Sequence, residues 1–357
     1  MSWSKGWWGP TLEGDQNDVR AMLDSFVDAH EPVLDDDPAT MAGLISELAE
    51  LGIWTVGTAE STGGGGAPRE LTVVALERLG RAWPALGWAS VQAHTAVDVL
   101  AGDDRFTDLV GRLHTGAAAV AVVDASSAQV RLAWSGDTLT GSIDRVDAAA
   151  ENPHVLVLVD DDTAALVAPT ALTTTPLRRT GLGGALTRSL EVQASGGDVH
   201  ELTAVDVASA RARLRIGAAA VAAGIAGAAA DEAADYATDR HQFGGPLTAI
   251  PTVRQSLLGQ ATRSIVTLGA VLAAGNDPIR ALAVVREACD GAIDVAAAAL
   301  QSHGGYGYLT EYNAERHLRD AVSLRAAADI QGAAVSAARA LVGLSPTATT
   351  ALTKEAS

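Results

Sequence analysis

Residues 205–247 decide the fold. A long run of small residues, VDVASARARLRIGAAAVAAGIAGAAADEAADYATD (205–239), leads directly into RHQFGGPL (240–247). Alanine-rich sequence favours helix, and Gly-Gly-Pro is typical of the place where a helix ends. The pattern predicts one long helix that stops at a polar turn. In that turn, Arg240 could bind a phosphate, Gln242 a ribose or ring edge, and Phe243 a heterocycle, although an ordinary helix stop has the same composition.

A second segment, QSHGGYGY (301–308), has the same character. Adjacent glycines leave backbone N–H groups uncovered, so Gly304 and Gly305 could form an anion-binding nest; a glycine-rich helix end is the alternative. The pair of segments is more informative than either one. Two glycine-ended helices, each with a polar side chain (Arg240 and Gln301), could bind a dinucleotide without a Rossmann fold.

The rest of the chain divides by its periodicity. Apolar residues at helical spacing, or helix-capping signals, predict the following helices: Asp15–His30, Pro38–Leu51, Glu70–Ala82, Ser90–Leu100, Pro251–Ala274, Asn276 to about Gly304, and Asn313–Leu341. Between about Ala117 and Leu202 the pattern changes to short β-branched runs separated by turn residues, which is typical of a compact antiparallel β-domain.

These zones predict an α+β fold with an N-terminal helical domain, a middle β-domain and a C-terminal four-helix bundle. We place the domains at residues 1–116, 117–203 and 204–345, followed by a tail at 346–357.

The composition excludes several classes of protein. Of the 357 residues, 48% are hydrophobic but only 4% are aromatic, so the core consists of small aliphatic side chains that suit packed helices. The formal charge of −18 opposes binding to nucleic acid or to anionic lipid. Cys289 is the single cysteine and the histidines are scattered, so we expect no disulfide within the chain and no metal site.

The sequence gives no sign of a signal peptide or of a membrane-spanning helix. The first residues carry no apolar stretch of a signal peptide, and the most apolar run, Ile216–Ala230, is shorter than the about 18–20 residues of a membrane-spanning helix. We expect a soluble, cytoplasmic protein.

The ordered motifs resemble those of the flavin-dependent acyl-CoA dehydrogenases over most of the chain. The family's R-x-Q-F-G corresponds to Arg240, Gln242, Phe243 and Gly244. Its Q-x-x-G-G-x-G-Y corresponds to Gln301, Gly304, Gly305, Gly307 and Tyr308. Its E-x-x-x-x-R-x-x-R-D-A corresponds to Glu311, Arg316, Arg319, Asp320 and Ala321.

The resemblance implies the fold predicted above and FAD as cofactor. In that family the first two motifs hold the ADP half of an FAD that is bound mainly by a neighbouring subunit. The flavin ring is held by the middle domain through a T-E-P-like turn and a W-I-T/S-like strand. Here the corresponding segments, Ala121–Ser126 and Gly141–Asp147, lack the Glu-Pro and the aromatic residue.

The catalytic base is also missing. Desaturation of an acyl-CoA needs a carboxylate that removes the α-proton while the β-hydride moves to the flavin. The two positions that the family uses correspond to Leu214 and Ala328. Asp329 is adjacent, but within a continuous helix one residue turns the side chain by about 100°, which makes Asp329 a poor substitute.

Three hypotheses remain open. In the one that we favour, the chain is the non-catalytic subunit of a heteromeric acyl-CoA dehydrogenase, like the heterotetrameric enzymes of actinobacterial steroid side-chain degradation. A homologous partner then supplies the base and the acyl-CoA site, and electron transfer flavoprotein accepts the electrons. The others are a self-sufficient dehydrogenase with a relocated base, and a flavin-free scaffold. The favoured hypothesis predicts that this chain alone is inactive.

Overall fold

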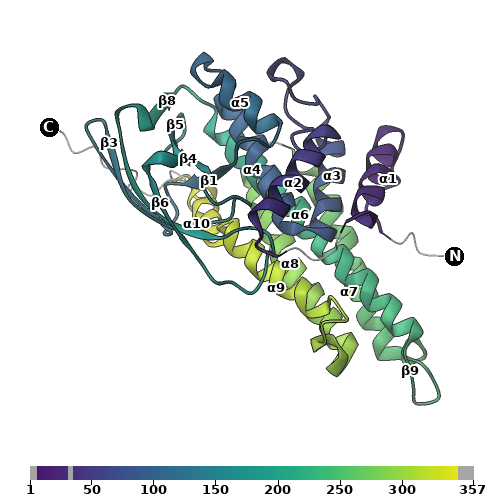
Figure 1. Cartoon of the computed structure of the whole chain (residues 1–357). Helices are drawn as coiled ribbons and strands as arrows, with labels where there is room; N and C mark the ends of the chain where they lie inside the picture. Colours follow the sequence, from purple (N-terminus) through teal and green to yellow (C-terminus); the bar gives the residue numbers. More distant parts are fainter. Residues whose placement is uncertain (1–5, 31–34, 276, 345–357) are drawn as a thin grey trace.

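The computed structural model describes residues 6–30, 35–275 and 277–344, so the expected tail at 346–357 lies outside the described residues. A helical region comes first, a β region follows, and a bundle of long helices comes last (Figure 1). This order confirms the predicted α+β fold class. The strands run from Val120 to Thr203 and the next long helix begins at Val207; the division into domains at 116 and 203 stays a prediction.

The N-terminal helices bury several of the largest side chains of the chain, including Leu23, Met41 and Trp83. Their bounds are α1 (Asp15–Asp28), α2 (Pro38–Glu50), α3 (Arg69–Ala82), α4 (Pro84–Leu100) and α5 (Thr107–His114). Asp37 caps α2, because its carboxylate accepts a hydrogen bond from the backbone N–H of Thr40 at 2.8 Å. Two expectations were wrong here: α4 begins six residues before Ser90, and α5 was not predicted.

The middle region consists of two four-stranded sheets, with strand orders β1-β4-β5-β8 and β2-β3-β7-β6 in the described residues. The strands are β1 (Val120–Asp124), β2 (Val130–Ser135), β3 (Thr138–Val146), β4 (His154–Leu158), β5 (Thr163–Val167), β6 (Leu172–Pro176), β7 (Arg188–Ser195) and β8 (Val199–Thr203). The predicted antiparallel pairing is wrong for β1 and β4, which run parallel with Val122 opposite Leu156. The chain between them passes through the β2–β3 hairpin of the other sheet, so β4 returns in the same direction as β1.

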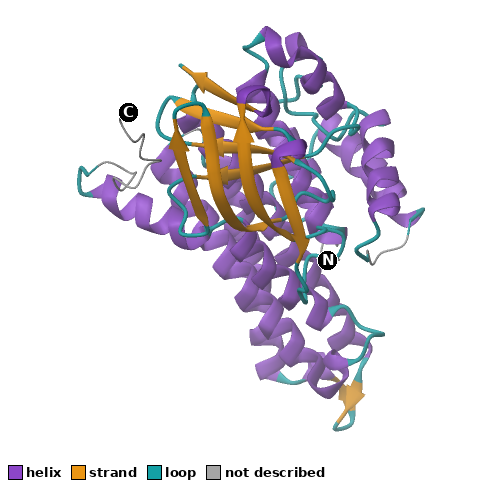
Figure 2. Ribbon diagram, turned by 60° about the vertical axis from the view of Figure 1, so that its left-hand side comes forward, coloured by secondary structure: helices purple, strands orange, loops and turns teal. Residues whose placement is uncertain are grey.

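The first sheet is buried on both faces. Alternate residues of β4 point in opposite directions: Val155 and Val157 pack in the cluster shared with the second sheet, whereas Leu156 and Leu158 pack with the side chains of α4 and α5. Figure 2 shows the sheets lying together at one end of the molecule, beside the helices. This arrangement joins the β region firmly to the N-terminal helices.

The C-terminal helices are α6 (Val207–Asp239), α7 (Pro251–Ala273), α8 (Pro278–His303), α9 (Ala314–Ala327) and α10 (Ile330–Leu341). The expectation of one helix over Asn313–Leu341 was wrong, because the chain breaks at Ala328 and Asp329. Asp329 has a φ of 45°, and its carboxylate accepts a hydrogen bond from the backbone N–H of Gly332 at 3.3 Å. Aspartate tolerates this backbone conformation and caps the helix that follows.

Two of the described helices, α6 and α7, are long and apolar enough to cross a bilayer by length and composition, although the Ile216–Ala230 run within α6 is too short by itself. In α6, 78% of the most apolar window is buried inside the protein, as in the core helix of a soluble protein; in α7 the value is 33%. These helices are therefore weak evidence for a membrane protein, and α7 leaves apolar side chains on the surface.

Candidate functional site

The first group of predicted site residues lies at the far end of the bundle, where Arg240 ends α6 (Figure 1). The short strands β9 (His241–Gln242) and β10 (Gly245–Pro246) pair antiparallel with Gln242 opposite Gly245, so Phe243 and Gly244 form the turn. Their φ angles are 54° and 88°, as a tight type I′ hairpin requires. Phe243 is 90% exposed. No packing within the described chain explains a phenylalanine in this position.

The second predicted segment also leaves backbone uncovered. Gln301 is exposed near the end of α8, and the 3₁₀ turn η6 (Gly304–Tyr308) follows. A Cβ atom built on Gly304 or Gly305 would meet nothing within 4 Å, whereas one on Gly307 would lie 2.7 Å from a Leu300 methyl carbon. Gly307 therefore serves close packing, but Gly304 and Gly305 face open space.

The structure brings the two segments together. The guanidinium carbon of Arg240 lies 4.6 Å from the centre of the Tyr306 ring, and its Nη2 lies 3.5 Å from the Tyr306 hydroxyl. A cluster behind them holds this geometry: the rings of Tyr236 and His303 stack at 4.3 Å, and Tyr312 packs edge-on against both. Sequence reasoning missed Tyr306 as the partner of Arg240, although its place inside the glycine motif was a signal.

The polar groups at this end of the bundle are available to a ligand. The side chains of Gln242 and Gln301 are exposed and hydrogen-bond to none of the described residues. Arg240 forms no ion pair with a described carboxylate, since its neighbour is an aromatic ring. A guanidinium without a described carboxylate partner and an exposed ring fit the phosphates and the heterocycle of an ADP group. The Gly304 N–H donates to the backbone oxygen of Gln301, so the anion-binding nest expected from the sequence is wrong for this residue.

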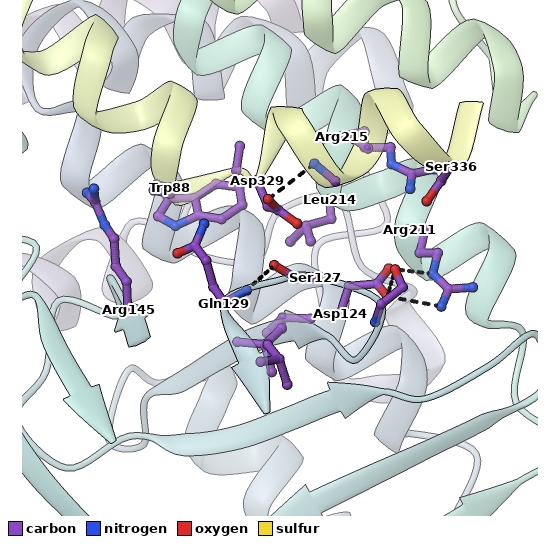
Figure 3. A pocket seen from close by; sticks show the side chains of 18 residues that line it. Trp88, Asp124, Ser127, Gln129, Arg145, Arg211, Leu214, Arg215, Asp329 and Ser336 are labelled. Carbon is purple, nitrogen blue, oxygen red and sulfur yellow. Dashed lines mark hydrogen bonds and ion pairs between the residues drawn. The ribbon is translucent and has the colours of Figure 1, made fainter. Parts of the chain in front are cut away.

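The second group of predicted residues lines a small cleft between the β region and the bundle (Figure 3). Leu214 reaches it from α6, and Ala328 from the break between α9 and α10. The two positions expected for the catalytic base therefore lie in one cavity. Val123 and Arg145, from the two segments expected to hold a flavin ring, line it as well.

An ion pair closes one side of this cleft. Arg211 Nε lies 2.7 Å from an oxygen of Asp124, and the Arg211 guanidinium also donates to the backbone oxygen of Asp160 at 3.0 Å. Burial opposes ionisation of the Asp124 carboxyl, but the charge and hydrogen bonds of Arg211 outweigh it, so the pKa of Asp124 is lowered. Asp124 thus stays ionised and bound to α6.

Asp329 also lines the cleft, which corrects our geometric argument against it. The 100° rotation between neighbouring residues applies within a continuous helix, and the helix is broken at this residue. Burial raises the pKa of the Asp329 carboxyl. Arg215, on the same wall, has its pKa lowered to about 10 by burial. The cleft therefore holds one carboxyl group whose pKa lies above its ordinary value.

The cleft does not fit a flavin ring. Its volume is about 70 Å³, whereas pockets for drug-sized ligands measure about 300–1,000 Å³. Sequence reasoning missed the pair that closes it, because Asp124 and Arg211 are 87 residues apart. The described residues thus fit the ADP half of FAD at the end of the bundle and do not fit its ring in the cleft.

Two family models match this chain. One is described as "Acyl-CoA dehydrogenase, N-terminal domain" and matches residues 13–102. The other is described as "Acyl-CoA dehydrogenase, C-terminal domain" and matches residues 207–328. Both candidate base positions and Arg240 fall within the second match.

Curated relatives match a shorter part. An acyl-CoA dehydrogenase of Bacillus subtilis (strain 168) is 40% identical over 114 residues, which are 30% of this chain and 30% of that protein. The short-chain specific acyl-CoA dehydrogenase of Megasphaera elsdenii is also 40% identical over 114 residues, with the same coverage. The chain therefore matches these relatives over 30% of their length.

Solved structures match almost the whole chain. Butyryl-CoA dehydrogenase from Megasphaera elsdenii is 22% identical, with a TM-score of 0.74 over 93% of this chain and 99% of that one. Glutaryl-CoA dehydrogenase from Mycobacterium smegmatis, in complex with FADH2, is 18% identical, with a TM-score of 0.76 over 95% and 96%. A structure of the electron transferring flavoprotein of Acidaminococcus fermentans is 21% identical, with a TM-score of 0.75 over 93% and 99%. At these sequence identities, the similarity to the solved structures shows a shared fold and nothing further.

Proposed function

Because the chain belongs to the acyl-CoA dehydrogenase family, we propose that it is one subunit of a heteromeric, FAD-dependent acyl-CoA dehydrogenase. In this proposal the assembly desaturates an acyl-CoA between its α and β carbons. A homologous partner removes the α-proton with its own carboxylate, and the β-hydride passes to FAD. This chain contributes the ADP half of the FAD site and no base.

One contrast within the molecule carries the proposal. The end of the bundle keeps a half-buried arginine that pairs with a tyrosine ring and with no described carboxylate, beside two glycines that face open space. The cleft has a volume of only about 70 Å³, is closed by the Asp124–Arg211 pair, and has Leu214 and Ala328 where a base is expected. A flavin-free scaffold would need no such arginine, and a self-sufficient enzyme would need a larger cleft.

The residues at the bundle end have separate roles in this proposal. Arg240 neutralises phosphate charge, and Gly304 and Gly305, where a Cβ atom would meet nothing within 4 Å, leave room for a phosphate to approach the turn. Gln242 and Gln301 bind polar edges of the ADP group, and Phe243 packs against it. FAD supplies the hydride acceptor when bound; the residues of this chain fix its ADP end and keep it oriented toward the partner.

The surface of α7 supports a partner subunit. Leu258, Ile265 and Val266 are 59%, 46% and 62% exposed, and apolar surface of this kind marks an interface between proteins. We extend the proposal to a cytoplasmic assembly that passes electrons to electron transfer flavoprotein. The substrate class that we favour is a bulky, steroid side-chain thioester.

The test is to co-express the chain with a homologue that has a carboxylate at the position equivalent to Leu214. We expect a soluble yellow tetramer of two kinds of subunit, with half as many FAD molecules as chains. Flavin absorbance per protein mass and native mass spectrometry measure this ratio. Assays with a steroid side-chain CoA thioester and with butyryl-CoA then identify the substrate class.

Each chain expressed separately is the control. We expect this chain alone to aggregate or to lack flavin, since each assembled FAD needs both kinds of subunit. A stable homotetramer of this chain with one FAD per subunit would contradict the proposal.

A second candidate function rests on Asp329. Its carboxyl lines the cleft beside Leu214 and Ala328, and burial raises its pKa, which is the direction in which enzymes shift the pKa of a carboxylate base. If this chain acts alone with Asp329 as a relocated base, the purified protein will reduce an artificial acceptor with an acyl-CoA. Asp329→Asn will abolish that turnover, and Asp198→Asn, outside the cleft, will not. Absence of turnover in the wild-type chain eliminates this candidate.

A further inference from the structure

A larger hollow lies on another face of α6 than the cleft does and also contacts α4. Its volume is about 330 Å³, within the range of about 300–1,000 Å³ for small-molecule sites. On α4 it is lined by Val91, His94 and Asp98, which share one helical face. On α6 it is lined by Ser209, Arg213, Ile216 and Gly217, whereas Arg211, Leu214 and Arg215 line the cleft.

The hollow combines an apolar floor with cationic side chains. Val73, Leu76 and Val91 are buried aliphatic residues, and Ile216 is only 6% exposed. Arg69 and Arg213 carry positive charge, and Asp98 is the acidic residue of the described lining. Since Arg213 forms an ion pair with Asp98, Arg69 leaves the lining with an excess of one positive charge.

Arg69 has an unfilled hydrogen-bonding position. Its Nε is buried and has no hydrogen-bond partner among the described residues. Its Nη2 donates to the backbone oxygen of Leu272 at 3.2 Å and lies 3.3 Å from a Glu70 oxygen. The Glu70 side chain is 47% exposed, so that ion pair is weak. A buried donor without a partner is costly, and an anion in the hollow would satisfy it.

His94, in contrast, has no free position. One ring nitrogen accepts from the Gly57 N–H at 3.0 Å, and the other lies 2.8 Å from the backbone oxygen of Ser90. Burial lowers the pKa of His94 to about 4, so it is neutral and contributes only an uncharged surface to the wall. The anion-binding group of the hollow is therefore Arg69.

We propose that this hollow binds an aliphatic carboxylate. The hydrocarbon chain lies against Val73, Leu76 and Ile216, and the carboxylate bonds to Arg69. The site is independent of FAD and of the cleft, because it shares no lining residue with the cleft and is formed by α3, α4, the other face of α6, and the loop that contains Gly57 and Ala67.

The probe is octanoate, titrated calorimetrically into the full chain in the assembly in which it purifies. We expect one binding site per chain for octanoate. Octanol, which has the chain without the charge, and inorganic phosphate, which has charge without the chain, bind at least about ten-fold more weakly, because each lacks one of the two interactions. Equal affinity for octanol, or displacement of octanoate by phosphate, overturns the assigned ligand class.

Variants locate the site. Ser209→Trp fills the hollow from α6 and should abolish octanoate binding. Arg69→Gln should weaken octanoate binding about ten-fold or more while leaving the affinity for octanol unchanged. Arg280→Gln removes an exposed arginine elsewhere and should bind as the wild type does. If the circular dichroism spectrum of Arg69→Gln shows that this variant does not fold, octanoate binding by Ser209→Trp is the test of the proposal. Wild-type affinity in Ser209→Trp, or no octanoate binding by the wild type, overturns the proposal.

Discussion

Arg240 differs in its surroundings from most arginines of this protein. Arg211 and Arg319, for example, are bound to carboxylates at 2.7 Å and 2.5 Å, whereas Arg240 lies over the ring of Tyr306. A ring stabilises a guanidinium without neutralising it. Arg240 is therefore bound to no described carboxylate, although Asp235, Asp239 and Glu311 line the same hollow and partly offset its charge.

Arg240→Ala should lower the FAD content of the assembled complex. The variant loses a charge-assisted contact of about 1.5–3 kcal/mol, so the apparent dissociation constant of FAD should rise about ten-fold or more. Flavin absorbance after extensive dialysis measures the loss. Arg286→Ala, which removes a 66%-exposed arginine on α8, is the matched control. Full flavin retention by the Arg240→Ala complex would refute the assignment.

Asp329 gives a prediction on pH. Burial raises the pKa of its carboxyl in the folded state, so the folded chain binds a proton more tightly than the unfolded chain does. The contribution of Asp329 to stability therefore falls as pH rises from the ordinary aspartate pKa through the raised value. Asp329→Asn should increase the thermal midpoint at pH 7 relative to the wild type, and the difference should shrink toward pH 3.

The control for this prediction is Asp206→Asn. The pKa of Asp206 is lowered by its hydrogen bonds to Ser209, so that variant should lose stability at pH 7 instead. A thermal midpoint of Asp329→Asn that lies below the wild type at pH 7 by as much as at pH 3 would contradict the prediction.

At the level of residues, the sequence predicted the groups that sit inside short motifs. Gln301, Gly304 and Gly305 lie within five consecutive residues, so their spacing alone brings them to one helix end. The closure of the cleft depends on Asp124 in β1 and Arg211 in α6, which are 87 residues apart and meet only in the folded chain. No local sequence pattern predicts an ion pair between residues so far apart in the chain.

Glycines control the approach of α6 to α3. A Cβ atom on Gly224 would lie 2.1 Å from the backbone oxygen of Glu77, and one on Gly80 would lie 2.3 Å from that of Val221. The two backbones therefore touch, and the small residues that the sequence analysis interpreted as helix formers also serve this close packing.

Gly224→Ala should destabilise the protein by about 1–3 kcal/mol, because the added methyl group forces the two helices apart. Urea denaturation followed by circular dichroism measures the change. Gly259→Ala on α7 is the matched control: its Cβ would meet nothing within 4 Å, so that variant should be neutral or stabilising by about 0.5–1 kcal/mol. Equal stability of the two variants would show that α3 and α6 can separate without cost.

The elements were predicted best where local signals are strong. Asp277 and Pro278 mark the start of α8, and the structure has the Asp277 carboxylate accepting from the Arg280 N–H at 2.7 Å. The parallel pairing of β1 with β4 has no local signal, since it follows from where the intervening hairpin lies. The break at Asp329 was missed because the alanine-rich sequence around it favours helix on both sides.

At the scale of the whole molecule, the apolar surface of α7 needs an explanation. Leu258, Ile265 and Val266 lie on the outer side of a helix whose inner face, with Leu268 and Val271, is fully buried in the bundle. Seven and eight residues separate Leu258 from the other two, so the three share one helical face. A contiguous apolar face of this kind is costly in water and is stabilised by association.

Val266→Glu should weaken the assembly. Burial of a valine side chain contributes about 1.5–3 kcal/mol, and a carboxylate in its place must lose water without a partner. The dissociation constant between subunits should therefore rise by more than about ten-fold, while the circular dichroism spectrum of the chain stays unchanged. Native mass spectrometry at decreasing concentration measures the shift toward smaller species.

Leu51→Glu, at the 40%-exposed end of α2, places a carboxylate on an apolar position away from this face and should leave the assembly intact. If Val266→Glu keeps the full mass and flavin content at every concentration at which the wild type does, α7 is not the association surface, and the partner must contact another face.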